Sequence, residues 1–398
     1  MEEWKEYRLG EIGKIITGKT PRTAIKGNYG GTIPFLTPSD DMACKFVSHT
    51  NKTLTPLGLA EVKNCLLPEN SICVSCIGSD LGKVVKTQEP SVTNQQINSI
   101  IPYKAFDADF VYYLMCIVGK DLNFISKTST AVPIVNKSTF SNYKVRIPQI
   151  GVQKAIGNIL SSLDDKIELN RKINSNLEEQ AKALFKSWFI DFEPFKDGKF
   201  IDSELGMIPE GWKVTTIGDV TENIKEKVGN RNDIKVLSPI TSGQLVLSED
   251  YFSKQVFSNS IAKYIVVNHN DFAYNPARIN IGSIGMNEFE FDGCVSPVYV
   301  VFRCQSGYEY FFDLYRRTSY FIEEVKKRAI GGVRQNLSYK DLSLIQLIYP
   351  PKKVVDAFNF IYISFIHGIH SNDVSNKKLE AIRDTLLPKL MSGEIDVR

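Results

Sequence analysis

Two halves of the chain repeat the same features in the same order, and this duplication limits the available folds more than any other property. Trp4-Lys5 precedes Leu9-Gly10-Glu11-Ile12, and 208 residues later Trp212-Lys213 precedes Ile217-Gly218-Asp219-Val220. Two further matches follow at offsets of 200 and 202: Gly82-Lys83-Val84 with Gly282-Ser283-Ile284, and Val145-Arg146-Ile147-Pro148 with Leu347-Ile348-Tyr349-Pro350. Loop insertions produce a drift of this size, so the sequence predicts two copies of one plan.

Each copy combines a mixed segment with a helical one. The mixed segments contain short β-branched runs, such as 71–77, 264–267 and 298–302, and helix-like runs at 108–118 and 308–328. We therefore expect an α+β fold with four parts: globular domains at 1–150 and 201–350, a central helical spacer at 151–200 and a C-terminal helical spacer at 351–398.

Composition excludes several classes of protein. The 398 residues are 43% hydrophobic and 23% charged, which is typical of a globular chain and not of a disordered one. The net charge of +3 provides no cationic field over the whole molecule, so a polyanion would have to meet a local patch. The seven cysteines and the acidic, aromatic segment Met1–Tyr7 predict a cytoplasmic protein. The apolar run Phe358–Ile366 is about half of the roughly 18 residues that a membrane helix needs, so no membrane span is expected.

The two spacers share a heptad pattern with an asparagine at the centre of each. We expect the two helices to form an antiparallel coiled coil in which Asn170 faces Asn372 and sets the register. Two separate amphipathic helices, each lying on its own domain, are the alternative. Pro388 should kink or end the second helix near Leu387. The expected core positions are Ile156, Leu163, Asn170, Leu177 and Leu184, then Ile159, Lys166, Ile173 and Gln180, with Phe358, Phe365, Asn372, Leu379 and Leu386 in the second helix.

Two similar domains held apart by such a rod would form a pseudo-two-fold repeat suited to two separated and unequal DNA half-sites. Both domains carry loop-like segments whose side chains suit bases and phosphates: Arg for guanine, Asn or Gln for adenine, and Gly for close backbone approach. Ordinary surface turns are the plain alternative for such segments. The candidate DNA-binding residues are Lys19, Thr20, Arg22, Ser79, Lys83, Asn94 and Gln95 in the first domain, and Asn275, Arg278, Asn280, Arg334 and Gln335 in the second.

Several motifs together resemble the specificity subunits of type I restriction-modification systems. They are the two Trp-Lys openings, the restart Ile208-Pro209-Glu210-Gly211-Trp212, the run Gln335-Asn336-Leu337-Ser338, and the helix ends Leu184-Phe185-Lys186-Ser187-Trp188-Phe189 and Leu386-Leu387-Pro388-Lys389-Leu390-Met391-Ser392-Gly393. The resemblance implies that each globule is a target-recognition domain for one part of a split target in double-stranded DNA. It also implies that the helical spacers dock two modification (methyltransferase) subunits and, through them, restriction subunits.

The same resemblance implies a chain without catalytic residues or cofactors of its own. S-adenosylmethionine, ATP and Mg²⁺ would then belong to the partner subunits, which would methylate adenine and cleave DNA. Two alternatives remain: a nucleotide-dependent enzyme and a tandem DNA-binding regulator without partners. The first uses Gly13–Thr20, which matches the phosphate-loop pattern but lacks a convincing strand before it and helix after it.

Two further motifs suggest metal sites, and neither is supported. Cys73-x-x-Cys76 has no second cysteine pair at zinc spacing, so a buried strand cysteine is the better interpretation. His367 and His370 share a helical face without a third ligand within one turn.

Overall fold

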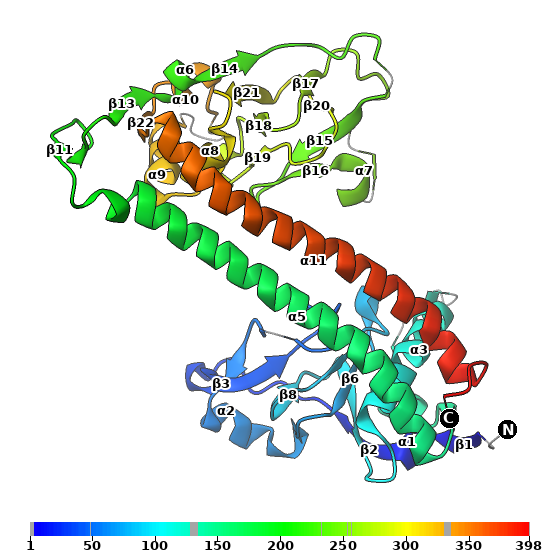
Figure 1. Cartoon of the computed structure of the whole chain (residues 1–398). Coiled ribbons are helices and arrows are strands. Elements are labelled where there is room, and N and C mark those ends of the chain that lie inside the picture. Colours follow the sequence, from blue (N-terminus) through cyan, green and yellow to red (C-terminus); the bar gives the residue numbers. More distant parts are fainter. Residues whose placement is uncertain are drawn as a thin grey trace. The chain divides into compact units, whose positions relative to one another are not determined.

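A computed structural model describes residues 4–47, 49–127, 134–231, 233–252, 254–255, 257–329 and 336–397. The chain forms two compact units, one comprising Met1–Lys172 with Ser371–Arg398 and the other Ile173–His370. Both units mix helices and small sheets (Figure 1), so the expected α+β class is confirmed. The four domain boundaries stay a prediction.

The first unit contains two four-stranded sheets and one strand pair. The strand pair is β1 (Lys5–Arg8) with β10 (Lys144–Ile147). One sheet has the order β2-β9-β6-β7 and the other β4-β3-β8-β5. Their strands are β2 (Gly13–Thr17), β3 (Tyr29–Leu36), β4 (Thr53–Leu54), β5 (Leu66–Leu67), β6 (Ile72–Ser75), β7 (Val84–Lys86), β8 (Ser91–Thr93) and β9 (Ile97–Pro102).

Helices cover these sheets and close the first core. The long helix α3 (Ala108–Lys127) contributes the buried Phe110, Tyr113 and Met115 to the cluster that also holds Ile72 and Ile100 from the sheet. The shorter helices are α1 (Leu9–Ile12), α2 (Pro56–Glu61), α4 (Lys137–Ser141) and the 3-10 turns η1 (Lys26–Asn28), η2 (Lys63–Cys65) and η3 (Gly78–Asp80).

The second unit repeats this topology strand for strand. Its strand pair is β13 with β22, and its sheets have the orders β14-β21-β18-β19 and β16-β15-β20-β17. The inner pair is parallel in both units, β3 with β8 and β15 with β20, and the other pairs are antiparallel. The strands are β13 (Lys213–Thr216), β14 (Thr221–Ile224), β15 (Lys235–Pro239), β16 (Leu245–Leu247), β17 (Ile265–Val267), β18 (Phe272–Tyr274), β19 (Ile284–Met286), β20 (Gly293–Val295), β21 (Val300–Cys304) and β22 (Gln346–Tyr349).

The helices of the second unit differ mainly where the first unit has α3. Two helices, α8 (Glu309–Tyr315) and α9 (Ser319–Arg328), stand in its place, because the Thr318 hydroxyl accepts a hydrogen bond from the Phe321 amide and starts a new helix. The remaining short elements are α6 (Ile217–Val220), α7 (Ser248–Tyr251), α10 (Tyr339–Leu342), η4 (Glu193–Phe195), η5 (Ile279–Ile281) and the strand pair β11 (Phe200–Ile201) with β12 (Ile208–Pro209). The predicted internal repeat is confirmed by this common topology.

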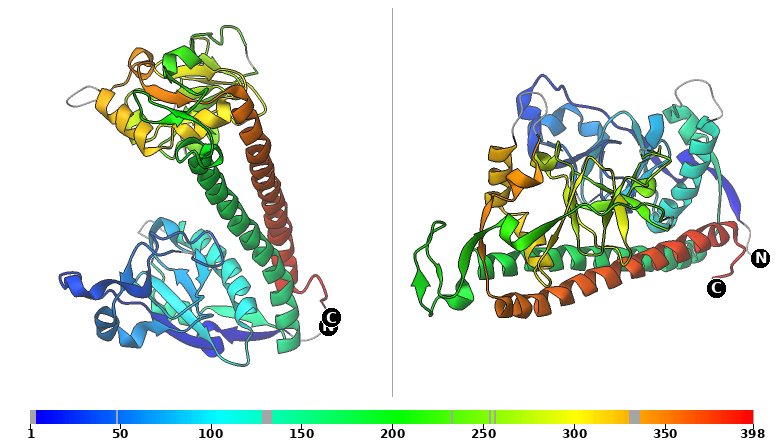
Figure 2. Two further views of the ribbon diagram at one scale, coloured as in Figure 1. Left: turned by 60° about the vertical axis from the view of Figure 1, so that its left-hand side comes forward. Right: turned by 90° about the horizontal axis from the view of Figure 1, so that it is seen from above.

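Two long helices follow the mixed segments, as the heptad pattern predicts. They are α5 (Ile150–Phe189) and α11 (Lys352–Ser392). Pro388 lies inside α11, so the helix does not end near Leu387. In both views of Figure 2, the last turns of α11 (red) run beside the first half of α5 within the first unit.

The second expected core position on α5 was one residue out of place. Ile159 and Ile173 are 39% and 38% exposed, whereas Leu160 and Ile167 are buried. The buried positions of α5 are therefore spaced by four residues and then by three, as from Ile156 to Leu160 and from Ile167 to Asn170. The expected spacing was three and then four. Both spacings lie on one helical face, and tertiary packing selects between them, because Leu160 is buried in the core of the first unit.

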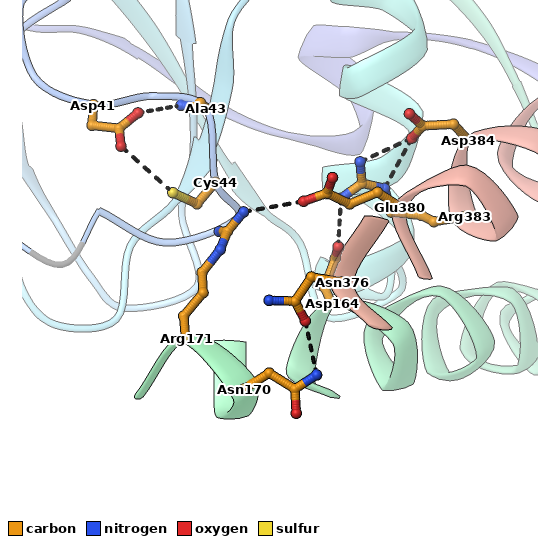
Figure 3. Close-up of polar contacts among 10 residues, drawn as sticks. All are labelled: Asp41, Ala43, Cys44, Asp164, Asn170, Arg171, Asn376, Glu380, Arg383 and Asp384. Carbon is orange, nitrogen blue, oxygen red and sulfur yellow. Dashed lines mark hydrogen bonds and ion pairs between the residues drawn. The ribbon is translucent and has the colours of Figure 1, made fainter. Parts of the chain in front are cut away.

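Asn170 does not pair with Asn372, which corrects the expected register by one helical turn. Its Nδ2 donates to Oδ1 of Asn376 over 2.8 Å, in a part of the first unit where both amides are buried (Figure 3). Earlier in α5, Asp164 bonds Arg383 at 2.7 Å, so the partner number on α11 falls as the number on α5 rises, which is the antiparallel order. The predicted asparagine contact thus exists with a different partner.

The ends of the long helices join the cores of the globules. Leu387, Leu390 and Met391 of α11 are buried in the core of the first unit, beside Trp4. Phe185 and Phe189 of α5 are buried in the core of the second unit, where Phe189 lies 6.0 Å from Trp212 between ring centres. Within the described residues, no helix has an apolar run long enough to cross a bilayer.

Candidate nucleic-acid interface

Two loops of the first unit meet at the end of β2: the loop that follows β2 and the turn between β8 and β9. The Gly18 amide donates to the Ile97 carbonyl at 3.1 Å, and the Lys19 amide donates to the Thr93 carbonyl at 2.9 Å. A Cβ on Gly18 would lie 2.2 Å from the Asn94 carbonyl oxygen, so only glycine allows this approach. The backbone thereby brings the candidate residues near 19 and 94 together.

Two of these candidates touch each other directly. Thr20 Oγ1 donates to Gln95 Oε1 at 2.7 Å, and both side chains are at the surface. Asn94 is 8% exposed and forms two hydrogen bonds with Gln96. Asn94 Nδ2 donates to Gln96 Oε1 at 2.9 Å, and the Gln96 backbone amide donates to Asn94 Oδ1 at 3.0 Å. Asn94 therefore shapes the turn, while Gln95 and Lys19 are exposed to a ligand.

Arg22 is exposed but already paired. Its Nε and Nη2 both donate to Oε1 of Glu61, at 3.0 and 2.7 Å. These bonds, together with a bond from the Arg22 backbone amide, lower the pKa of Glu61 to about 2. A base contact by Arg22 would have to compete with this pair.

The loop between β6 and β7 places two more candidates. Lys83 Nζ lies 2.7 Å from Oδ1 of Asp80, with both side chains partly exposed. Ser79 lies in η3, between Gly78 and Asp80. Gly82 has φ of +89°, and a Cβ there would lie 2.1 Å from the Gly119 carbonyl oxygen. The loop is thus held against α3 through a position that requires glycine.

The corresponding loop of the second unit, between β18 and β19, carries Asn275, Arg278 and Asn280. Asn275 Oδ1 accepts from the Ala277 amide at 3.0 Å, which folds the loop back toward η5. Arg278 is exposed and Asn280 is half-buried in η5. Gly282, at φ of +97°, occupies the same place as Gly82, so the aligned glycines serve the same turn.

Arg334 and Gln335 lie outside the described residues. For all twelve candidates the DNA contact stays a prediction.

Gly13–Thr20 does not form a phosphate-binding loop. Residues Gly13–Thr17 are the strand β2, with Lys14 opposite Ile101 in the pairing with β9. The next helical element is the three-residue turn η1 at Lys26. Because phosphate binding requires a loop that leads directly into a helix, the structure contradicts the nucleotide-site hypothesis.

The cysteine pair also has a structural explanation. Cys73 is buried in β6, and burial raises its pKa to about 12. Cys76 is buried after the strand and accepts a 3.3 Å bond from Asn98 Nδ2. Within the described part of the chain, no three His, Cys, Asp or Glu side chains gather in a way that could hold a metal ion.

Two features of the structure were not among the predictions. Lys45 is buried between Asp109, 2.8 Å from its Nζ, and Ser161 Oγ at 2.7 Å, and no sequence signal predicts this burial. The turn Ser296–Tyr299 was also missed, although the offset of 202 from Asn94–Ile97 would have found it.

The chain thus builds one α+β topology twice and follows each copy with a long helix. Residues 1–179 match the family model of the type I restriction modification DNA specificity domain. The whole chain is 28% identical over 416 residues to the type I restriction enzyme MjaIX specificity subunit of Methanocaldococcus jannaschii, covering 100% of this chain and 94% of the relative. It is 23% identical to the HindI specificity subunit of Haemophilus influenzae, covering 99% and 100%.

A solved structure shares the fold. The S subunit of a type I restriction-modification system from M. genitalium superposes with a TM-score of 0.59 at 13% identity, over 98% of this chain and 96% of that one. The resemblance to type I specificity subunits that the sequence motifs indicated is therefore confirmed over the full length of the chain.

Proposed function

We propose that this chain is the DNA specificity subunit of a type I restriction-modification complex. Each unit would bind one part of a two-part target in double-stranded DNA. The observation that carries this proposal is one topology built twice with different side chains on equivalent loops, Lys83 beside Gly82 in one unit and Arg278 near Gly282 in the other. Two copies of one fold with different loops can bind two different short sequences.

The chain itself would be non-catalytic. Two modification subunits and the restriction subunits would supply methylation and cleavage, and with them S-adenosylmethionine, ATP and Mg²⁺. The relatives are named as specificity subunits of restriction enzymes, which supports this division of labour.

The test is a map of methylated adenines in the host genome, with and without this gene. We expect a two-part motif with an unmethylated gap of constant length, and we expect it to vanish on deletion. An unchanged map contradicts the proposal. A regulator without partners would bind a specific site but leave the map intact.

Two variants refine the test. Gln95→Ala should relax the first part of the motif alone, and Arg278→Ala the second part alone, because a good bidentate base contact discriminates by about 1–3 kcal/mol. Lys104→Ala, at an exposed lysine in the turn after β9, is the matched control and should leave both parts unchanged. Loss of both parts on one substitution would contradict the assignment of one unit to one half-site.

A further inference from the structure

The turns between β8 and β9 and between β20 and β21 occupy equivalent places in the two units. In the first unit, Val74 of β6 pairs with Asn98 of β9, and in the second, Tyr274 of β18 pairs with Val300 of β21. Tyr274 lies 200 residues after Val74, and Val300 lies 202 residues after Asn98. The same offsets relate other matching segments of the repeat. The structural register therefore aligns Asn94-Gln95-Gln96 with Ser296-Pro297-Val298.

Both turns also close in the same way. The Ile97 amide donates to the Asn94 carbonyl at 3.2 Å, and the Tyr299 amide donates to the Ser296 carbonyl at 2.9 Å. An identical backbone bond places the intervening side chains alike at the strand ends. The two turns thus present different chemistry from one scaffold.

The exposed side chains of the two turns differ: the turn of the first unit carries amides and the turn of the second unit carries hydrocarbon side chains. Gln95 and Gln96 are exposed amides, whereas Val298 is 70% exposed and follows the exposed Pro297. A single exposed apolar side chain is ordinary on a protein surface, so its position in the turn carries the argument. Because proline fixes its own backbone φ, it lowers the entropy lost when the turn is ordered on a ligand.

The turn also lies near a cation suited to a phosphate. Tyr274 at the end of β18 pairs with Val300 at the start of β21, so the loop after β18 and the turn before β21 lie at the same end of the sheet. This register places Arg278 and Val298 on neighbouring loops. An exposed valine beside an exposed guanidinium suits a DNA groove, because a base edge lies there next to the phosphate backbone.

We propose that Val298 contacts the C5-methyl group of a thymine in the second half-site. In the first unit the residue aligned with Val298 is Gln96, and that turn would instead present an amide to an adenine. Thymine is the base whose major-groove edge carries a methyl group, and apolar side chains contact that group. This inference rests on the proposed function, because it requires a DNA target.

The test uses the full-length chain assembled with its modification subunits and a duplex carrying the mapped target. Each thymine of the second half-site is replaced in turn by deoxyuridine, which removes only the methyl group. We expect one position at which the affinity of the wild-type complex falls about fourfold, the equivalent of one methyl group at roughly 0.8 kcal/mol. Val298→Ala should show the same affinity for thymine and uracil at that position.

Two further variants sharpen the result. Val298→Gln should shift the preference at that position toward adenine, because it restores the amide chemistry of the first turn. Leu57→Ala, at a side chain 57% exposed in the first unit, should retain the full uracil effect. An unchanged melting temperature of Val298→Ala would show that the substitution leaves the fold intact.

The outcomes separate the two proposals. A complex that binds its two-part target equally well with thymine and uracil overturns the role of Val298 and leaves the proposed function standing. The same holds if Val298→Ala keeps the uracil effect or if the second half-site contains no thymine. A complex without a specific target overturns both.

Discussion

Single residues decide which candidate side chains are available to a ligand. Lys19 and Gln95 were predicted from residue type and lie at the surface of one loop cluster. Arg22 and Lys83 were predicted on the same grounds, yet each forms an ion pair with a carboxylate, Glu61 or Asp80. Residue type predicts what a side chain could bind, and the folded neighbours determine what it already binds.

The Arg22–Glu61 pair leads to a pH-dependent prediction. The pKa of Glu61 falls from 4.5 to about 2 beside Arg22. Because the folded value is depressed, the stabilising contribution is complete above the unfolded pKa and is lost as the pH falls through about 2. A ¹³C titration of the Glu61 carboxyl should therefore have its midpoint near 2, and in Arg22→Gln it should return toward 4.5. Equal midpoints in the two proteins would contradict this assignment.

At the scale of elements, the two long helices show how far a heptad pattern extends. The pattern predicted their existence, their approximate bounds and a buried amide in the seam. It did not predict the partner of Asn170, because Asn372 and Asn376 lie one turn apart on the same face. The choice between them depends on neighbouring contacts such as Asp164 with Arg383 at 2.7 Å (Figure 3).

The amide pair predicts strongly non-additive stability. Asn170→Leu alone leaves Oδ1 of Asn376 without its donor, and we expect a loss of about 1–3 kcal/mol in the free energy of unfolding. Replacing both residues with leucine removes both polar groups and should be close to neutral or stabilising. Denaturant unfolding of the two single variants and the double variant measures the coupling. Single effects that add up to the double effect would show that the amides act independently.

At the scale of the whole molecule, each globule is completed by the end of a long helix, and in the first unit that end is distant in sequence. The first unit consists of Met1–Lys172 and Ser371–Arg398, so its core needs the last residues of the chain. Leu390 is 1% exposed there and Phe185 is 4% exposed in the second core. The division into units therefore follows spatial contacts and cuts across both long helices.

This organisation predicts that damage at one helix end stays within one unit. Leu390→Ala should cost about 2–5 kcal/mol through a lost apolar contact and a cavity, and should speed amide exchange in β2, β6 and β9. Phe185→Ala is the matched variant and should speed exchange in β14, β18 and β21 instead. Hydrogen exchange measured strand by strand distinguishes these patterns. A uniform increase over both units in either variant would contradict the division.

The amino-acid sequence by itself determined the duplication, the α+β class, the two long helices and the loops that carry the candidate residues. Those features follow from local periodicity, from turn residues such as Gly82 and Gly282, and from a self-comparison that needs no coordinates. Only the tertiary structure decided that Asn170 bonds Asn376, that Gly13–Thr17 is a strand and that Lys45 is buried. Each of these depends on contacts between residues far apart in the chain, whose free energies no local pattern encodes.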